Sequence, residues 1–399
     1  MPNLLRGNRD LMRGMNRAIL LKAIKANEPI SRAVLAHLTG LSPATVTAIT
    51  GDLIAEDLVF EKETGDSSGG RRPILLALNP RGGFVVGVKL MEDHAVGALT
   101  DLNAAVLIKD SIQFPDSTLD SVIDALVSLV NHLIAHGGIN KKQLLGVGVG
   151  LAGVVDSSSG MLRQSPFFGW KDTPLRDLLQ NHLHVPIYID NDVNTLTLGE
   201  KWLGTGIPLD NFVVITVGRG IGMGMVINGQ IVRGKSGGAG EFGHIVVDTK
   251  GPMCDCGKRG CLEAFLSDRA LLATARQQVA EDVSDIDDLV NRAAAGSDAA
   301  KHVLAWAGEL LGLQIANLVN ILDPKLIIIS GEGVRMGDVF FSALRAAVSQ
   351  NVMPGLAKDS EIRMAAWGDD VWARGAASVV IGELFNSPIQ KEEAVNRPL

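Results

Sequence analysis

Apolar residues at helical spacing predict a series of helices at the start of the chain. Over residues 15–27 the predicted helix has one apolar face, made of Met15, Ile19, Leu20, Ala23 and Ile24. A second, short helix is predicted between Ser31, whose side chain can cap the first turn, and Gly40, which can end it. The two helices are separated by Glu28, Pro29 and Ile30.

A third predicted helix follows Gly40 almost directly. Ser42 can cap it, Pro43 suits its first position, and its buried stripe consists of Val46, Ile49 and Leu53. Two helices joined by a glycine-centred turn of this length are typical of a helix-turn-helix, whose second helix can enter the major groove of DNA. The candidate DNA-binding residues of this helix are Ser42 and the outward-facing Ala44, Thr45, Thr47 and Thr50. Such side chains can meet phosphates and thymine methyl groups, but they do not predict the base sequence that is read.

Two extended segments around a Gly/Ser-rich tip, over residues 59–80, predict a wing behind these helices. Arg71 and Arg72 stand at the tip, between Gly70 and Pro73. Adjacent arginines in an extended chain can enter a narrow minor groove, where the negative potential of DNA is concentrated. A solvated hairpin turn is the alternative for the pair alone, but behind a basic helical triplet the DNA interpretation is favoured.

From residue 83 the pattern changes to short strands, and it does so twice. Three strand-like runs, "FVVGVKL", "AVGALTD" and "AAVLIKDSI", precede a helical stretch near 119–135 and the apolar strand "LLGVGVGLAG". A similar order returns with "NFVVITV", "GMGMVING" and "QIVRG", a helical region over 266–320, and the strand "KLIIIS". Two halves of this kind predict duplicated α/β lobes.

Charge is distributed unevenly along the chain. The formal net charge is −7, yet residues 1–80 hold ten Lys and Arg against eight Asp and Glu, whereas the remainder holds 27 against 36. Within the first 25 residues there are six basic residues and one acidic residue. We therefore expect double-stranded DNA to be a partner of the amino-terminal part alone.

No targeting or membrane segment is predicted. Arginines interrupt the amino-terminal stretch, which lacks the continuous apolar region of a signal peptide, and no window approaches the ~18 apolar residues of a membrane span. The expected location is the cytoplasm.

All three cysteines of the 399-residue chain fall within a stretch of eight residues, as Cys254, Cys256 and Cys261. Three thiols cannot pair completely, and the C-x-C-x4-C spacing suits reduced thiolates on a metal ion better than a disulfide framework.

Five motifs support a family resemblance. In chain order they are "IDNDVNTLTLGE", "ITVGRGIGMG", "GEFGH", "CDCGKRGCLE" and "IIISGEGV". With the winged front end included, the chain resembles the ROK family of repressors and sugar kinases, and among its members the sugar-responsive transcriptional regulators, over nearly its whole length. The resemblance implies an α/β fold: a winged helix-turn-helix followed by an actin-like (ribonuclease H-like) sugar-kinase fold, whose two lobes close on a sugar. The expected domains are 1–80, 81–195 completed by carboxy-terminal helices over 371–390, and 196–370.

The resemblance also implies a metal site and a sugar site. His244, ten residues before the first cysteine, can complete a closed tetrahedral zinc site with Cys254, Cys256 and Cys261, which leaves no position for an activated water and is therefore structural. In the family the same histidine contacts the sugar, and the sugar residues carried over are Asn191, Asp192, Glu241, His244 and Glu263. The sugar itself is not predicted. Phe167 and Phe168 stand where relatives often have an Asn, which is compatible with a smaller or less polar sugar such as a pentose.

The motifs favour a regulator over an enzyme. Family kinases carry Asp-x-Gly-Gly-Thr in the first strand of the fold, where backbone and hydroxyl groups cradle phosphate. Here Lys89 takes the place of the Asp and bulky or acidic residues follow it; Arg219 replaces a Thr, and Glu332 enters a glycine run near the nucleotide position. We therefore expect no ATP cofactor. The alternatives are an active ATP-dependent sugar kinase with Asp192 as its base, and a zinc-dependent scaffold without an effector.

A regulator of this kind implies three partners. They are a double-stranded DNA operator, a monosaccharide effector, and a second copy of the chain in a homodimer or tetramer, because operators read by such modules usually meet two copies.

Overall fold

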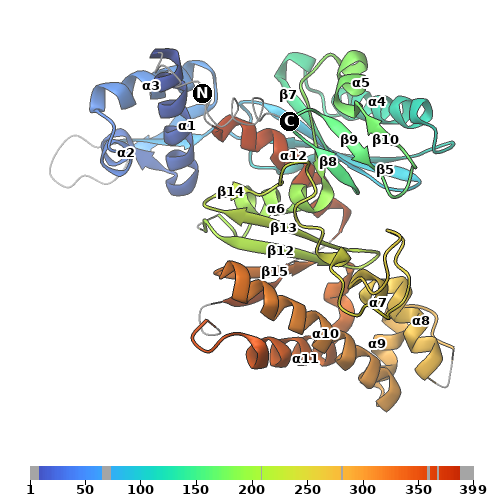
Figure 1. Cartoon of the computed structure of the whole chain (residues 1–399). Coiled ribbons are helices and arrows are strands. Elements are labelled where there is room, and N and C mark those ends of the chain that lie inside the picture. The colour runs from blue at the N-terminus through green and yellow to red at the C-terminus, as the bar shows by residue number, and fades with distance from the viewer. Residues whose placement is uncertain are drawn as a thin grey trace, which may run out of the picture. The chain divides into compact units, whose positions relative to one another are not determined.

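The computed structural model describes residues 9–64, 73–207, 209–279, 282–356, 360–365 and 368–386 (Figure 1). Two compact units make up the chain: Met1–Pro208 with Ala373–Leu399, and Leu209–Trp372. The expected boundary after residue 195 falls inside helix α6 (Asp192–Leu203), and the units divide instead after Pro208. Helix α12 (Asp369–Phe385) returns the chain to the first unit.

The amino-terminal domain has the predicted helices and wing. Its elements are α1 (Arg9–Asn27), β1 (Ile30–Ser31), α2 (Arg32–Thr39), α3 (Pro43–Ala55), β2 (Val59–Thr64) and β3 (Ile74–Leu78). The strands form one antiparallel sheet in the order β1-β3-β2. Helix α1 begins at Arg9, earlier than predicted, and Arg13 in this added part pairs with Asp52 of α3 rather than extending the apolar face.

The first α/β lobe is built on a five-stranded sheet in the order β11-β7-β4-β5-β6. Its elements are β4 (Phe84–Leu90), β5 (His94–Asp101), β6 (Val106–Gln113), α4 (Leu119–His136), the 3₁₀ turn η1 (Lys141–Gln143), β7 (Leu144–Leu151), α5 (Leu175–Leu183), β11 (Ile187–Asn191) and α6. A small sheet that the sequence did not predict lies between β7 and α5 in the chain: β8 (Val154–Asp156), β9 (Met161–Gln164) and β10 (Lys171–Thr173).

The second unit repeats this topology, with a five-stranded sheet in the order β14-β13-β12-β15-β16. The strands are β12 (Phe212–Val217), β13 (Ile221–Ile227), β14 (Gln230–Ile231), β15 (Leu326–Ser330) and β16 (Glu361–Met364). In both sheets three consecutive strands form an antiparallel meander and two later strands add in parallel beside the first, which confirms the predicted duplication.

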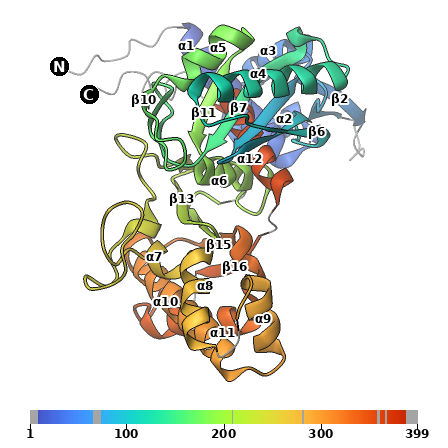
Figure 2. The same cartoon turned by 90° about the vertical axis from the view of Figure 1, so that its right-hand side faces the viewer.

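The helices of the second unit gather on one side of its sheet (Figure 2). They are α7 (Glu263–Leu266), α8 (Asp268–Gln278), α9 (Ile286–Ala294), α10 (Asp298–Leu322) and α11 (Gly337–Asn351), with the 3₁₀ turns η2 (Phe242–His244) and η3 (Glu332–Met336). The helical region predicted over 266–320 is thus divided, because Ser267, Asp285 and Ser297 each accept a backbone N–H and start a new helix.

Strand β7 shows how the first lobe is layered. Its glycines alternate with valines, so one face is apolar and the other has no side chains. Val147 and Val149 lie in the core formed with α4 and α5. On the other face, a Cβ added to Gly148 would lie 2.0 Å from the carbonyl oxygen of Ala376 in α12, and one added to Gly150 would lie 2.8 Å from the hydroxyl of Thr195 in α6. Helices α6 and α12 therefore rest directly on the sheet backbone.

Two helices, α4 and α10, are long and apolar enough to cross a membrane, each with a mean hydropathy of 1.2 in the relevant window. The expectation that no segment approaches this length and composition was therefore wrong. Both helices bury apolar residues within their own lobes, in the cores that include Leu129 and Ile315. Their apolar character is explained by packing inside an α/β fold.

Candidate functional site

Local capping fixes the helix-turn-helix. The hydroxyl of Ser31 accepts the backbone N–H of Val34 at 3.3 Å, and Gly40 ends α2 in the left-handed region with φ of 69°. The hydroxyl of Ser42 accepts the N–H of Thr45 at 3.2 Å. Helices α2 and α3 then meet at 118°, which lies in the range of DNA-binding helix-turn-helix pairs.

The outward face of α3 is small and uncharged. Ser42, Ala44 and Thr47 are exposed and Thr45 is half-buried, so these predicted positions are available to a ligand. Thr50 is fully buried; its hydroxyl donates to the carbonyl of Val46 at 2.8 Å and accepts from Arg32 Nε at 3.1 Å. The prediction that Thr50 points outward was wrong, and we remove it from the candidate surface. Arg71 and Arg72 lie outside the described residues.

Ion pairs between α1 and α3 were not predicted. The guanidinium of Arg13 donates to Asp52, and that of Arg17 pairs with both carboxylate oxygens of Glu56, one of them at 2.8 Å. Part of the basic charge at the start of the chain therefore holds the helices together rather than facing outward.

Asn191 and Asp192 lie where β11 meets α6. The side-chain oxygen of Asn191 caps α6 by accepting the N–H groups of Val193 and Asn194, and its amide donates to the carbonyl of Gly153 at 3.0 Å. One carboxylate oxygen of Asp192 accepts the N–H of Val193 at 2.9 Å. These bonds fix both side chains at the carboxyl end of a parallel strand, the usual place for a ligand in α/β folds.

Lys89 lies in contact with Asp192. It lies in β4, is only 7% exposed, and donates from its ammonium group to the second carboxylate oxygen of Asp192. From the sequence, Lys89 was noted only as the residue that replaces the Asp of family kinases. Its ion pair with Asp192 was not predicted. The neighbouring aromatic loop is packed: the rings of Phe168 and Trp170 stack at 4.3 Å, while Phe167 is 39% exposed.

The other predicted sugar residues belong to the second unit. Glu263 accepts the N–H of Ile221 at 2.9 Å from the start of α7, and Glu241 lies with one carboxylate oxygen 3.7 Å from Nε2 of His244. A Cβ added to Gly218 would lie 2.1 Å from a carboxylate oxygen of Glu332. Carboxylates of Glu263 and Glu332 thus line the turn between β12 and β13.

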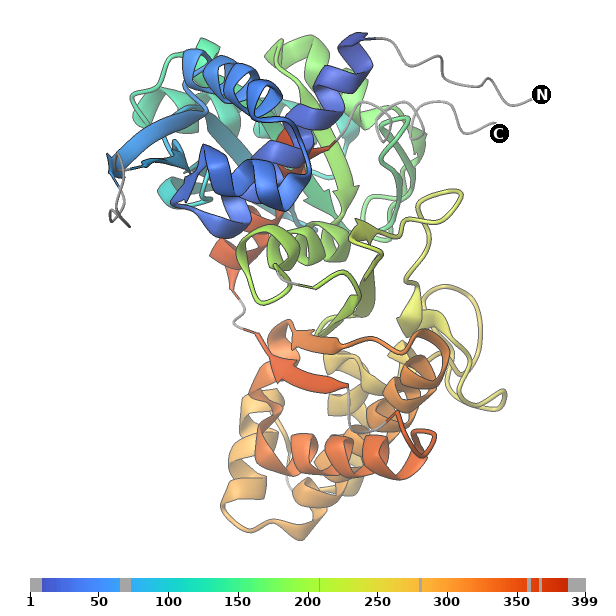
Figure 3. The same ribbon diagram turned by 90° about the vertical axis from the view of Figure 1, so that its left-hand side faces the viewer.

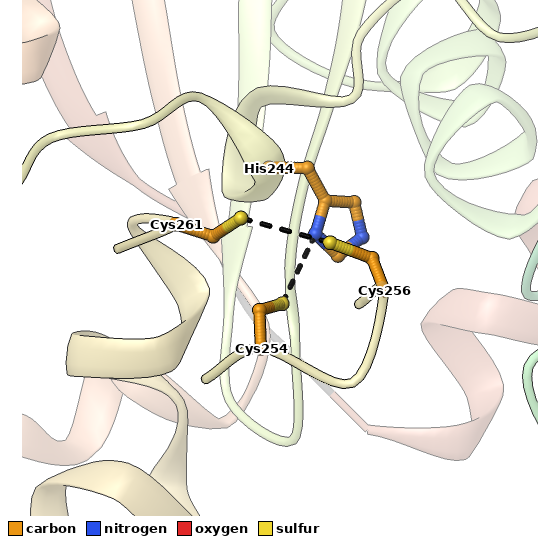
Figure 4. A group of neighbouring side chains, drawn as sticks. All are labelled: His244, Cys254, Cys256 and Cys261. Atoms are coloured by element: carbon orange, nitrogen blue, oxygen red, sulfur yellow. Dashed lines mark hydrogen bonds between the residues drawn. The ribbon is translucent and has the colours of Figure 1, made fainter. Parts of the chain in front are cut away.

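His244 and the three cysteines converge into one cluster, as predicted (Figure 4). Their ligand atoms all lie within 4.8 Å of one another; Nδ1 of His244 is 3.5 Å from Sγ of Cys254, and the sulfurs of Cys256 and Cys261 are 3.6 Å apart. Around a tetrahedral zinc ion the corresponding separations are about 3.6 Å and about 3.8 Å. The donor set and its spacing therefore fit a metal ion.

Backbone turns shape this cluster. Gly257 and Gly260 adopt φ of 86° and 72°, and a Cβ on Gly260 would lie 1.5 Å from the carbonyl oxygen of Asp248. Cys254 and Cys261 are buried while Cys256 is exposed. Burial raises the pKa of the Cys254 thiol to about 12, so without a cation beside it this thiol stays protonated.

Comparison with known proteins identifies the family. A model described as ROK family matches residues 85–383, and one described as winged helix-turn-helix DNA-binding matches residues 16–59. The xylose repressor of Bacillus subtilis (strain 168) is 32% identical over 95% of this chain and 98% of its own length. The N-acetylglucosamine repressor of Escherichia coli O157:H7 is 31% identical over 87% of each.

Solved structures of ROK family proteins are similar to this chain. A ROK family transcriptional regulator described as a homolog of the E. coli MLC protein has a TM-score of 0.85 at 27% identity, covering 97% of this chain and all of that one. A ROK family glucokinase from Streptomyces griseus, in complex with glucose and AMPPNP, has a TM-score of 0.65 at 26% identity, covering 74% and 99%. The chain belongs to the ROK family and joins its kinase-like α/β fold to an amino-terminal winged helix-turn-helix DNA-binding domain.

Proposed function

We propose that this protein is a sugar-responsive transcriptional repressor of carbohydrate genes that acts in the cytoplasm. DNA is bound by the exposed face of α3, with Ser42, Ala44, Thr45 and Thr47, and by Arg71 and Arg72 of the wing. Relatives that match most of the chain are named xylose repressor and N-acetylglucosamine repressor.

The ion pair between Lys89 and Asp192 is the observation that favours a regulator over a kinase. A general base must reach the hydroxyl proton that it removes. The carboxylate of Asp192 already accepts from a buried ammonium group, and its other oxygen accepts a backbone N–H. The Glu332 carboxylate beside Gly218 adds negative charge to a glycine turn, which disfavours a nucleotide phosphate there. ATP is accordingly not a cofactor in this proposal.

The effector in this proposal is a monosaccharide contacted by Asn191, Asp192, Glu241, His244 and Glu263. D-xylose is the first candidate, because xylose repressors are 32% identical over 94–95% of the chain and because Phe167 and Phe168 suit a sugar with few polar substituents. A structural zinc ion held by His244, Cys254, Cys256 and Cys261 would order the loop that follows Glu241 and fix the ring of His244 through Nδ1.

A homodimer or tetramer completes the proposal. Winged helix-turn-helix domains usually read two half-sites, so a two-fold assembly matches a palindromic operator. Light scattering of the purified chain, alone and on DNA, measures the number of copies.

The test is a thermal-shift panel of D-xylose, D-glucose and N-acetylglucosamine on zinc-loaded protein, each repeated with ATP and magnesium and assayed for ADP. Stabilisation by one sugar without ADP is the expected result. A kinase is the second candidate, because the fold matches a glucokinase that binds AMPPNP and Asp192 is present. Sugar-dependent ADP formation that disappears in Asp192→Asn would establish the kinase. The same result would overturn the proposal that the protein is a repressor with no enzyme activity.

A further inference from the structure

Helix α6 connects the proposed sugar site to the DNA-binding domain within the first unit. It begins at Asp192, and at its other end Trp202 and Leu203 pack against the core that contains Leu21 and Leu58 of the winged helix-turn-helix. A helix of this length spans about 18 Å. One rigid element thus touches both functional regions.

Helix α12 crosses α6 at a contact between glycines. A Cβ added to Gly199 of α6 would lie 3.3 Å from the Cα of Gly375, and one added to Gly375 would lie 3.0 Å from the carbonyl oxygen of Thr195. The two backbones therefore come into contact at these glycines, and the nearest side-chain atom printed for Gly199 is Oγ of the small residue Ser378, 3.8 Å from the added Cβ. Such a contact allows one helix to rotate or slide on the other, whereas interdigitated side chains would fix it.

Both ends of α6 are held, in contrast, by specific side-chain contacts. At the start Asp192 pairs with Lys89 of the sheet. At the other end the ring of Trp202 stacks at 5.0 Å on Phe385 of α12, and a Cβ on Gly382 would lie 2.8 Å from Nε1 of Trp202. Phe385 shares its core with Leu20, Leu21, Leu58 and Leu78 of the DNA-binding domain. Figure 3 shows α12 (red) beside the amino-terminal helices (blue).

The indole N–H of Trp202 is buried and has no hydrogen-bond partner among the described residues. The ring is therefore positioned by stacking and packing alone, and a small rotation of α6 costs no hydrogen bond there.

We propose that α6 is a lever that turns on α12 at the contact between Gly199 and Gly375 and couples sugar binding at Asn191 and Asp192 to the DNA-binding domain through Trp202 and Phe385. The proposal rests on the proposed function, because it names how that sugar site acts. A sugar that competes with Lys89 for Asp192 shifts the start of α6, and the glycine contact passes the rotation to Trp202. Small shifts of this kind are the usual basis of switching between packed helices.

Gly199→Ala and Gly375→Ala test the lever, because a methyl group at the crossing obstructs rotation while leaving the sugar and DNA residues unchanged. Gly97→Ala is the matched control: it lies on β5 of the same sheet, and the atoms nearest its added Cβ are side-chain atoms of Leu133 and Leu129 on α4, at 2.8–3.2 Å, rather than backbone. The probes are D-xylose, or whichever sugar of the panel stabilises the protein, and a DNA fragment selected from a random pool by the wild-type protein.

Calorimetry measures sugar affinity, and fluorescence anisotropy measures DNA affinity with and without saturating sugar. In Gly199→Ala and Gly375→Ala, the affinity for sugar and the affinity for DNA without sugar each stay within about threefold of wild type. The ratio of DNA affinities without and with sugar falls by at least about fivefold in these variants, whereas Gly97→Ala keeps the wild-type ratio. Trp202→Phe, which loses no hydrogen bond, removes most of the sugar-induced change in tryptophan emission.

Two results overturn the lever in distinguishable ways. If sugar changes DNA affinity equally in wild type and in both crossing variants, the lever fails and the proposed function stands. If no sugar of the panel changes the DNA affinity of the wild-type protein, the proposed function fails and the lever fails with it.

Discussion

The ammonium group of Lys89 donates to the carboxylate of Asp192, and the two side chains are only 9% and 14% exposed. Lys89→Met should therefore leave a buried carboxylate without its counterion and lower the free energy of unfolding by about 3 kcal/mol. Urea denaturation measures the loss. The double variant Lys89→Met with Asp192→Asn should lose less than the sum of the single losses, since no unpaired charge remains. Additive losses would show that the two groups do not interact.

Cys256→Ser should release the metal ion and destabilise the second unit. Cys256 is exposed, so the substitution changes packing little and its effect reports on metal binding. We expect elemental analysis to show loss of bound zinc. The thermal midpoint should also fall, by about 2–4 °C for each kcal/mol of unfolding free energy that is lost. Asp255→Ser, at the adjacent exposed position, is the control and should keep the zinc. Retention of zinc in Cys256→Ser would exclude this thiol as a ligand.

Gly51→Ala should strengthen the fold and weaken operator binding. Gly51 is an exposed interior residue of α3, and a Cβ there would meet no atom within 4 Å. Alanine should therefore stabilise the helix by about 0.5–1 kcal/mol. Gly51 shares the outward face with Ala44 and Thr47, so a methyl group there obstructs close approach to DNA. Thermal unfolding and anisotropy check the two effects; unchanged affinity for the selected DNA would remove this face from the interface.

Replacing Arg71 and Arg72 together by Ala should weaken DNA binding and flatten its dependence on salt. Each phosphate contact that is lost removes about one unit from the slope of log K against log salt concentration. Titrations at several salt concentrations measure the slope. A slope equal to that of the wild type would contradict a wing contact.

Asp156→Asn should reduce stability at neutral pH and less at acidic pH. Although burial favours the neutral carboxyl, hydrogen bonds from Ser158, Ser159 and Arg163 lower the pKa of Asp156 to about 2. The lowered pKa stabilises the folded state fully above the unfolded-state pKa, by about 2 kcal/mol, and this contribution is lost as pH falls towards 2.

Urea denaturation should show that the deficit of Asp156→Asn at pH 7 is roughly halved at pH 3. Asp172→Asn is the control, because this carboxylate accepts from the same Arg163 at 3.1 Å but is 70% exposed. A deficit that does not depend on pH would mean that the ionised carboxylate is not what stabilises this turn.

Local features of the chain could be predicted from the sequence because their causes are local. The caps of α2 and α3 lie within three residues of the groups they bind, and the candidate metal ligands follow one another over residues 244–261. The duplicated sheets followed from repeated strand patterns.

The errors and omissions have physical reasons. Thr50 stands four residues after Val46 and three before Leu53, so the spacing that buried those residues also buries Thr50; its hydroxyl suggested a DNA contact instead. Lys89 and Asp192 are 103 residues apart, and Arg13 and Asp52 are 39 apart, so only the tertiary fold brings these charges together. The glycines at the crossing of α6 and α12 likewise carry no signal of their partner in the sequence.

The place of α12 has a consequence for synthesis of the protein. Ala377, Val380, Ile381 and Phe385 complete the same core as Leu21, Leu58 and Leu78, although they are made about three hundred residues later. A ribosome that stops before residue 385 therefore releases a DNA-binding domain whose apolar core is open. Interrupted translation should therefore expose Leu21, Leu58 and Leu78, which α12 otherwise helps to cover.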